Sequence, residues 1–568
     1  MTTKGPSVSR LRSDVRVCPP HETLVAAFEA AARDDAPFVT LHATAGPVVR
    51  PIKQALASAV RFASLYRARG VVRGECVLLL MPTGHSFVEA MLGAMFLGAI
   101  PVPLATPMTF GSVDRYLKNL TAIVADCGAR TLVTYPRIAT ALPGNAELTA
   151  ALSNVLMETD LEGLGPTPFV PPSIGASDVA FLQYTSGTTG RPKGAAISHG
   201  AVVSNAFAIH HALTMTPNDV GASWLPMFHD MGLVGVLLTS ICHPYPVHVM
   251  TPEAFVMHPR RWLELVSKVG ATLSPAPNFA YDMCVAKASQ ADVRLESWRV
   301  ALNGAEPVHA RTVARFCDQF ASRGFGADVM MPVYGMAETT LAIAFPTLDR
   351  KFETVPIDRD ALERDGLVRE SSAPSAYPAV SVGYPVAGTV LEILDDEGRV
   401  VPEGTVGQIT VAGPSLMSGY FRNEQASAEA IVGGALRTGD LGFVHAGRLF
   451  VAGRAKEIII KGGRNLHPYD IERVASNVEG VRAGGVAAFG RENPETGTED
   501  LVVVAETQHG EGDRREQIAT DVRAELLSVL GVKPEEIRVC AVGSLPRTTS
   551  GKIRRRECAR VFAAKGNA

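Results

Sequence analysis

The most informative local pattern in the sequence is a run of glycines and hydroxyl side chains at residues 184–194 (YTSGTTGRPKG). It follows an apolar stretch, residues 179–183, of the kind that forms a buried strand. Glycines let the backbone turn tightly and present its N–H groups, while hydroxyls and Lys193 add donors and positive charge. A polyphosphate suits these groups better than the alternative, a plain polar hairpin loop. The residues expected to contact it are Thr185, Ser186, Gly187, Thr188, Thr189, Gly190 and Lys193.

This phosphate-binding pattern differs from a P-loop. A Walker A loop needs Gly-Lys followed by Ser or Thr, whereas the only Gly-Lys pair of the chain, at residues 551–552, is followed by Ile553. The sequence also lacks the G-x-S-x-G elbow of α/β-hydrolases and the H-E-x-x-H helix of zinc proteases. Kinase-type, ATPase and hydrolase functions are therefore disfavoured.

Length and composition indicate a globular protein with more than one domain. The 568 residues exceed what one hydrophobic core usually serves, and 46% of them are hydrophobic. A net charge of −3 argues against a nucleic-acid binder. Eight scattered cysteines without a C-x-x-C pair fit a reducing compartment. The N-terminus has no signal-peptide pattern, and prolines interrupt the longest uncharged stretch, residues 90–108, so we expect a cytoplasmic chain with no transmembrane segment.

The elements that must position the loop alternate between strand and helix patterns. Residues 76–81 form an apolar strand pattern, Phe87, Met91 and Met95 recur at helical spacing, and residues 101–104 open the next strand. Such alternation predicts an α/β fold with a mostly parallel sheet, in which ligands bind beyond the carboxyl ends of the strands.

Two changes of pattern follow in the second half of the chain. From about Gly383, short strands with tight turns predict an antiparallel subdomain. After Arg454, a segment of about 110 residues mixes strands and helices and is large enough to form a separate small domain.

Further motifs, in the same order along the chain, resemble those of the adenylate-forming superfamily: acyl-CoA synthetases, luciferases and peptide-synthetase adenylation domains. The loop at 184–194 resembles the phosphate-binding signature of that superfamily. The other matches are residues 304–307, 334–338 and 438–440, Arg454, and residues 546–552. The resemblance spans nearly the whole chain. It implies a large N-terminal domain, residues 1–454, with βαβ-type sheets and a β subdomain, and a small mobile α+β C-terminal domain, residues 455–568.

The resemblance implies ATP and Mg²⁺ as cofactors and a role for each matching residue. A carboxylate oxygen attacks the α-phosphate of ATP and expels pyrophosphate, so the protein must align two anions and neutralise charge. A flexible point charge such as Lys552 and a hard oxygen ligand such as Glu338 suit these tasks. The catalytic residues are then Lys552, His229 and Lys193, with His229 as a gate to an acyl tunnel. The implied adenine contacts are Gly304, Ala305, Glu306, Tyr334, Gly335, Met336 and Ala337; Asp440 and Arg454 hold the ribose, Glu338 binds magnesium, and Lys456 is the hinge.

Three departures from the common superfamily pattern resemble fatty acyl-AMP ligases in particular. Ala337 stands where Thr is usual, residues 224–233 resemble the acyl-site motif of that group, and about 30 residues at roughly 347–377 look like its insertion. In that group the insertion restrains the small domain and disfavours coenzyme A. The fatty acyl group then passes to the phosphopantetheine thiol of an acyl carrier protein, here in trans, in lipopeptide, polyketide or complex-lipid synthesis.

Several alternatives stay open at the level of sequence. The chain could be a fatty acyl-CoA synthetase with a decorative surface insertion, or a catalytically silent acyl-AMP-binding protein. Against the silent protein, the positions of Lys193, Glu338, Asp440 and Lys552 all hold competent residues. Two apolar stretches, residues 233–241 and 274–281, could line the tunnel or belong to the core, and the basic run at 554–556 could meet a carrier protein or be a solvated surface.

Overall fold

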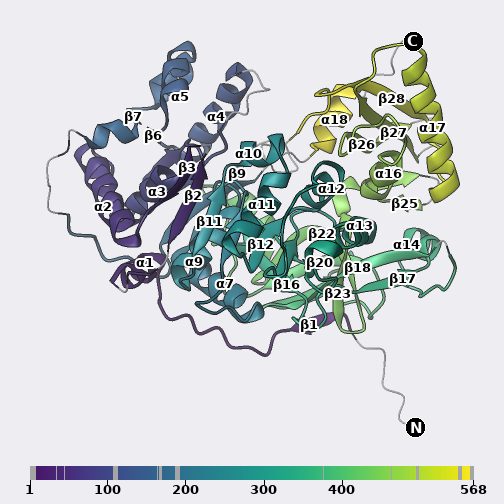
Figure 1. Ribbon diagram of the computed structural model, residues 1–568, viewed down its shortest axis with the longest axis horizontal. Coiled ribbons are helices and arrows are strands. Elements are labelled where there is room, and N and C mark those ends of the chain that lie inside the picture. The colour runs from purple at the N-terminus through teal and green to yellow at the C-terminus, as the bar shows by residue number, and fades with distance from the viewer. Residues whose placement is uncertain are drawn as a thin grey trace, which may run out of the picture.

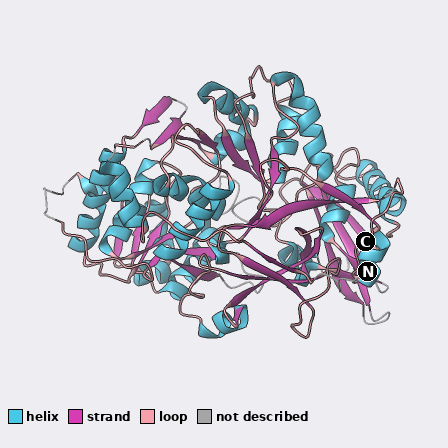
Figure 2. Cartoon of the chain, turned by 90° about the horizontal axis from the view of Figure 1, so that it is seen from below, coloured by secondary structure: helices cyan, strands magenta, loops and turns pink. Residues whose placement is uncertain are grey.

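A computed structural model describes most of the chain and shows a mixed α/β protein (Figure 1), which confirms the predicted class. Helices flank the strands on either side (Figure 2). The described residues are 8–33, 35–36, 38–43, 45–106, 113–162, 164, 169–185, 192–374, 376–461, 464–493, 498–547 and 553–562.

A seven-stranded sheet carries the cavity described below. Its order is β14-β13-β12-β10-β11-β2-β3, and every pairing is parallel except that of β2 with β3. Every residue of β12 and β13 is buried, as expected for a parallel sheet covered on both faces. The bounds are β2 Val39–Ala43, β3 Gly46–Val49, β10 Gly221–Ser223, β11 Val247–Met250, β12 Leu273–Ala276, β13 Val300–Asn303 and β14 Met330–Pro332.

The two faces of this sheet pack against different layers. One face meets an aromatic cluster that includes Trp262, Tyr281 and Phe316 and that is carried largely by helices. The other face packs against the helix α7 and a π-helical segment, Leu233–Leu238. The helices of these layers are α7 His199–Ala212, α8 Asp230–Gly232, α9 Thr239–Cys242, α10 Pro252–Met257, α11 Arg260–Val269, α12 Asn278–Lys287 and α13 Ala310–Phe320.

The N-terminal part contains a second parallel sheet, with the order β5-β4-β6-β7. The strand, helix and strand predicted between residues 76 and 104 are confirmed as β4, α3 and β5. The hairpin β8–β9 lies beside this sheet, since β8 contacts β5. The bounds are α1 Leu24–Arg33, α2 Ile52–Ala68, β4 Cys76–Leu79, α3 His85–Leu97, β5 Ile100–Pro103, α4 Val113–Cys127, β6 Thr131–Val133, α5 Pro136–Ala141, α6 Ala146–Ala151, β7 Asn154–Leu156, β8 Val179–Thr185 and β9 Lys193–Ser198.

A ten-stranded, antiparallel sheet forms the β subdomain. Its main path is β1-β19-β20-β22-β23-β18-β16-β15, with β17 paired to β18 and β21 to β22. The sheet begins earlier in the chain than Gly383, since β1, β15 and β16 reach it through long-range pairing that no local pattern reveals. The bounds are β1 Arg10–Arg12, β15 Tyr334–Gly335, β16 Ala342–Phe345, β17 Thr354–Ile357, α14 Arg359–Asp365, β18 Tyr377–Pro385, β19 Val390–Leu394, β20 Gly407–Ala412, α15 Glu424–Ala430, β21 Ile431–Val432, β22 Ala435–His445 and β23 Arg448–Arg454.

The segment after Arg454 lies at one end of the molecule (yellow-green to yellow in Figure 1) and has a hydrophobic core of its own. That core includes Ile471, Val503 and Val522. The three-stranded sheet β26-β27-β28 supports it. The bounds are η6 Ala455–Glu457, β24 Ile459–Lys461, β25 Arg464–Leu466, α16 Pro468–Ala475, β26 Val486–Asn493, β27 Thr498–Thr507, α17 Asp513–Leu530, β28 Glu536–Ala541 and α18 Arg555–Phe562.

The structure places the eight cysteines and most of the longest uncharged stretch. All eight cysteines are free thiols, so none forms a disulfide. The uncharged stretch that starts at residue 90 belongs to α3 and β5 as far as residue 103. Among the helices within the described ranges, none has both the length and the apolar character needed to cross a membrane.

Candidate active site

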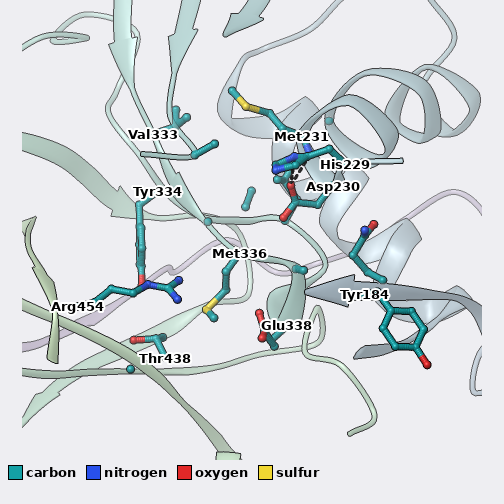
Figure 3. Close-up of a pocket in the computed structure, with 18 of the residues that line it drawn as sticks. Tyr184, His229, Asp230, Met231, Val333, Tyr334, Met336, Glu338, Thr438 and Arg454 are labelled. Carbon is teal, nitrogen blue, oxygen red and sulfur yellow. Dashed lines mark hydrogen bonds and ion pairs between the residues drawn. The ribbon is translucent and has the colours of Figure 1, made fainter. Parts of the chain in front are cut away.

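A cavity of about 1090 Å³ lies between the seven-stranded sheet, the hairpin β8–β9, the β subdomain and the start of α18. Its two ends differ in chemistry. The polar end includes Tyr334 beside Arg454, and Figure 3 shows His229 and Asp230 across the cavity from them. The second, apolar end is lined by aliphatic side chains from α7, the π-helical segment and the sheet. The cavity therefore joins a polar compartment to an apolar one.

Tyr334, Asp440 and Arg454 form a polar cluster beside the cavity, in which Tyr334 and Asp440 are buried and Arg454 is exposed. The Tyr334 hydroxyl donates a hydrogen bond to Asp440 Oδ2 at 2.7 Å, and Arg454 Nε lies 3.0 Å from Asp440 Oδ1. Asp440 and Arg454 are cross-strand partners on β22 and β23, which explains their proximity. Burial raises the pKa of Asp440, and the Arg454 guanidinium opposes that shift. The cluster brings together three residues that the sequence analysis assigned to the nucleotide.

Glu338 is a nearly buried carboxylate that lines the cavity, with 8% of its surface exposed. It lies on a short 3-10 turn, Ala337–Thr339, and its Oε1 accepts a hydrogen bond from the Tyr420 hydroxyl at 3.0 Å. Burial raises the pKa of this carboxyl group, while the Tyr420 hydrogen bond acts in the opposite direction. A buried carboxylate of this kind favours a nearby cation.

Asn205, on α7, positions the loop that carries Glu338. Its side chain is fully buried, donates to the carbonyl of Ala342 at 3.0 Å and accepts from the N–H of the same residue at 3.0 Å. This pair of bonds fixes the chain just after Thr340, which has a left-handed φ of 66°. The sequence analysis did not single out Asn205, because an isolated Asn in a helical pattern carries no local signal.

Lys193 is the first residue of β9 and lies on the same wall as Glu338. Its Nζ is 5.0 Å from the centre of the Tyr420 ring, within cation–π distance. Tyr420 therefore connects Lys193 to Glu338. Tyr420 was also missed from sequence, because its position depends on backbone pairing of the segment around it with β9: Phe421 N donates to Gly194 O at 2.8 Å.

Only part of the predicted adenine segment faces the cavity. Ala305 lines it and has a left-handed φ of 65°. Gly304 packs tightly, since an added Cβ would lie 2.9 Å from the Val333 carbonyl oxygen. Glu306 Oε1 accepts from the N–H of Phe279 at 2.6 Å, which ties this loop to the start of α12. Gly335, Met336 and Ala337 also line the cavity.

His229 lies at the N-terminus of α8 and lines the cavity together with Asp230. Its Nδ1 is 2.7 Å from Asp230 Oδ1, and both atoms face the N–H of Met231. The preceding carbonyl, of Phe228, accepts a hydrogen bond from Gln183 on β8 at 2.9 Å. This placement, between the polar and apolar ends, is compatible with the gate predicted for His229.

Two predicted segments lie outside the described residues. They are residues 186–190 of the phosphate loop, namely Ser186, Gly187, Thr188, Thr189 and Gly190, and the lysine Lys552. Thr185 is described only as the last residue of β8. The described neighbours Tyr184 and Lys193 on one side, and Ile553 on the other, line the cavity. Lys456 also lines it, exposed on η6 between β23 and β24.

The basic run at 554–556 is not a uniform solvated surface. Arg555 is buried, at 7% exposure, and its guanidinium pairs with Glu472 on α16 and with Glu457 on η6, each at 2.7 Å. It also lies 3.7 Å from the ring centre of Tyr469. Arg555 therefore anchors the start of α18 beside the predicted hinge, a role that periodicity alone cannot reveal.

Comparisons with known proteins agree with this geometry. The AMP-binding enzyme family matches residues 52–421. A Caulobacter vibrioides protein named as an acyl-CoA synthetase is 31% identical, over 95% of each chain. The medium-chain-fatty-acid–[acyl-carrier-protein] ligase JamA of Moorena producens is 33% identical, over 86% of each chain.

The solved structures include a close structural relative. It comes from work on fatty acyl-adenylate ligases of E. coli and L. pneumophila, with 32% identity and a TM-score of 0.89. The match covers 96% of this chain and 99% of that one, so the adenylate-forming fold is confirmed. The chain therefore belongs to the AMP-binding enzyme family and, within it, to the fatty acyl-AMP ligases of the adenylate-forming superfamily.

Proposed function

We propose that this chain activates a fatty acid with ATP to give the acyl-adenylate and pyrophosphate, and then transfers the acyl group to the phosphopantetheine thiol of a carrier protein. One observation carries the proposal. A single cavity joins a polar end to an apolar compartment, and the polar end is lined by the buried carboxylate of Glu338 and by Tyr334 and Arg454, the two side-chain partners of Asp440. A nucleotide at the polar end and an acyl chain at the apolar end would meet beside His229, where the carboxylate could face the α-phosphate.

The polar end offers a distinct group for each part of ATP. Asp440 keeps acceptor capacity beyond its bonds to Tyr334 and Arg454, because a carboxylate has about four lone-pair sites. It can therefore accept the ribose hydroxyls while Arg454 holds it in place. The ring of Tyr334 offers a flat surface for adenine. Lys193 and the loop before it would meet the phosphates.

The residues present fit a magnesium ion. Glu338 supplies one hard oxygen ligand at the cavity wall, and no cluster of three or more ligating side chains occurs in the described part of the chain. Mg²⁺ is commonly held by one or two carboxylates together with substrate phosphates and waters. When bound, the ion would neutralise phosphate charge. The Tyr420 hydroxyl would keep the Glu338 carboxylate oriented.

The choice of thiol acceptor depends on the segment after Arg454, which we propose to be a mobile domain that turns at Lys456. The predicted insertion holds that segment through α14. Glu363 on α14 is 3% exposed, and its Oε2 lies 3.1 Å from Arg464 Nε and 2.5 Å from Arg464 Nη2 on β25. Arg359, also on α14, lies 3.4 Å from Asp470 on α16. These buried pairs would resist the rotation that coenzyme A requires.

Replacing Glu363 by glutamine is therefore expected to increase acyl-CoA formation at least about tenfold, because breaking a buried pair removes several kcal/mol of attachment. Acyl-adenylate formation should change by less than about twofold, since Glu363 does not line the cavity. The rate of acyl-CoA formation in the presence of coenzyme A, and the rate of acyl-adenylate formation in its absence, would be measured by chromatography of the products. A point substitution is preferable to deletion, because deleting the insertion also removes β17 from its pairing with β18.

The matched control is Glu370→Gln. Glu370 is a mostly exposed carboxylate of the same insertion and pairs with His445 rather than with the segment after Arg454. This control should leave both rates unchanged. Unaltered acyl-CoA formation in a folded Glu363→Gln variant would show that the ion pairs do not restrain thiol use.

The proposal as a whole is tested by incubating the protein with labelled fatty acid, ATP and Mg²⁺, with and without coenzyme A. Acyl-adenylate that persists with coenzyme A and is consumed by a phosphopantetheinylated carrier protein would support it. Rapid conversion to acyl-CoA would assign the chain to the acyl-CoA synthetases. No acyl-adenylate with any fatty acid would leave the silent binding protein as the remaining interpretation.

A further inference from the structure

The apolar half of the cavity runs along one face of the seven-stranded sheet. Leu273 and Pro275 alternate along β12 and so point to the same face, and Leu302 on β13 lies opposite Pro275. The other face carries the aromatic cluster with Tyr281. The side chains that line the apolar half thus belong to one continuous surface of the sheet.

This surface reaches from the carboxyl ends of the strands to their amino ends. Ala305 and Val333, which follow β13 and β14, line the cavity on the nucleotide side. Gly221 and Leu273, the first residues of β10 and β12, line its far end. Three steps of about 3.3 Å along β12 give a depth of roughly 10 Å for this part. A tunnel of that depth accommodates an acyl chain of medium length.

Tyr245 closes the far end. It is buried, at 4% exposure, and lies just before β11. Its ring approaches the backbone at the start of β10, since a Cβ added to Gly221 would lie 3.0 Å from Tyr245 Cε2. Its hydroxyl lies 3.5 Å from the carbonyl oxygen of Val236 in the π-helical segment. The ring therefore spans from the sheet to the layer that covers it.

An ion pair between the buried Asp219 and the partly exposed Arg299 braces the elements around Tyr245. Arg299 Nε and Nη2 lie 2.7 and 2.9 Å from the two oxygens of Asp219, and Arg299 Nη1 donates to the carbonyl of Leu213 at 3.0 Å. Asp219 also accepts from the Thr272 hydroxyl at 2.6 Å. These bonds tie the loop before β10 to the amino ends of β12 and β13 and to the end of α7. Bidentate geometry of this kind is specific and strong.

We propose that Tyr245 is the specificity-determining residue for acyl chain length, and that it makes this chain selective for medium-chain fatty acids. The inference rests on the proposed function, because it concerns the same cavity. The Tyr245 ring acts as the floor of the tunnel, and the Asp219–Arg299 pair prevents the floor from yielding to a longer chain.

The test compares the native chain with Tyr245→Ala, Tyr245→Phe and Tyr281→Ala. Binding of octanoic, dodecanoic and hexadecanoic acids is measured by calorimetry, and acyl-adenylate formation is measured separately by pyrophosphate release. Tyr245→Ala should raise the affinity for hexadecanoic acid, relative to octanoic acid, by at least about tenfold, since two newly buried methylenes are worth that much. Tyr245→Phe keeps the aromatic ring, so its affinities for the three fatty acids should follow the same order as those of the native chain.

Tyr281→Ala is the matched control, because Tyr281 is a fully buried tyrosine packed on the opposite face of the same sheet. It should lower stability and leave the chain-length order unchanged. An unchanged order in Tyr245→Ala, or an equal shift in Tyr281→Ala, would overturn the proposal. The binding series also separates the two hypotheses: the predicted binding pattern without any acyl-adenylate would refute the proposed function and leave the role of Tyr245 intact.

Discussion

Replacing Lys552 by alanine is expected to lower the rate of acyl-adenylate formation by about 10²–10³-fold, while ATP affinity changes by less than about threefold. The physical reason is that a lysine in contact with both the carboxylate and the α-phosphate stabilises the transition state more strongly than it stabilises the complex with bound ATP. ATP–pyrophosphate exchange measures the rate, and calorimetry with ATP measures the affinity. Lys552→Arg should recover little activity, because a planar guanidinium does not replace a compact point charge.

The structure supplies a matched control for that experiment. Lys533 is an exposed lysine of the same C-terminal segment and does not line the cavity, so Lys533→Ala should leave both quantities unchanged. The segment around Lys552 should keep its anchor in the variant, because Arg555 holds the start of α18 on Glu457 and Glu472. Normal pyrophosphate exchange in Lys552→Ala would remove this residue from the catalytic set.

Asp440→Ala should instead raise the KM for ATP by about 10–100-fold, with a smaller effect on turnover at saturating ATP. Hydrogen bonds to a charged group contribute about 1.5–3 kcal/mol each, and the ribose would lose its charged acceptor. The variant also leaves the Tyr334 hydroxyl and Arg454 without their present partner, so stability should fall as well. Asp440→Asn keeps the shape of the side chain, and its KM for ATP should lie between those of the native chain and Asp440→Ala.

The control is Glu392→Ala, at β19 of the same sheet, where the carboxylate pairs with Arg10 near the surface and does not line the cavity. Its KM for ATP should match that of the native chain. If thermal unfolding shows that Asp440→Ala is folded and its KM for ATP is unaltered, the ribose assignment is wrong.

The sequence by itself determined which residue types stand at the ends of the strands. Short apolar runs predicted β4 and β8, since a strand that is buried on both faces leaves a continuous apolar pattern in the sequence. The motifs at residues 334–338 and 438–440 indicated two walls of the cavity, because each motif is a run of neighbouring residues that can be identified from the sequence alone. The structure places these two motifs at β15 and β22, strands of the ten-stranded sheet.

Only the tertiary structure decided how the walls meet. Tyr420 reaches Glu338 across 82 residues of sequence, and Asn205 clamps Ala342 across 137 residues. Likewise, Arg555 has the composition of a surface charge, yet it is buried between two glutamates. Tyr245 closes the tunnel only because β10, β11 and the π-helical segment converge there. Such contacts depend on which distant elements pack together, and a local hydrophobic period contains no information about that choice.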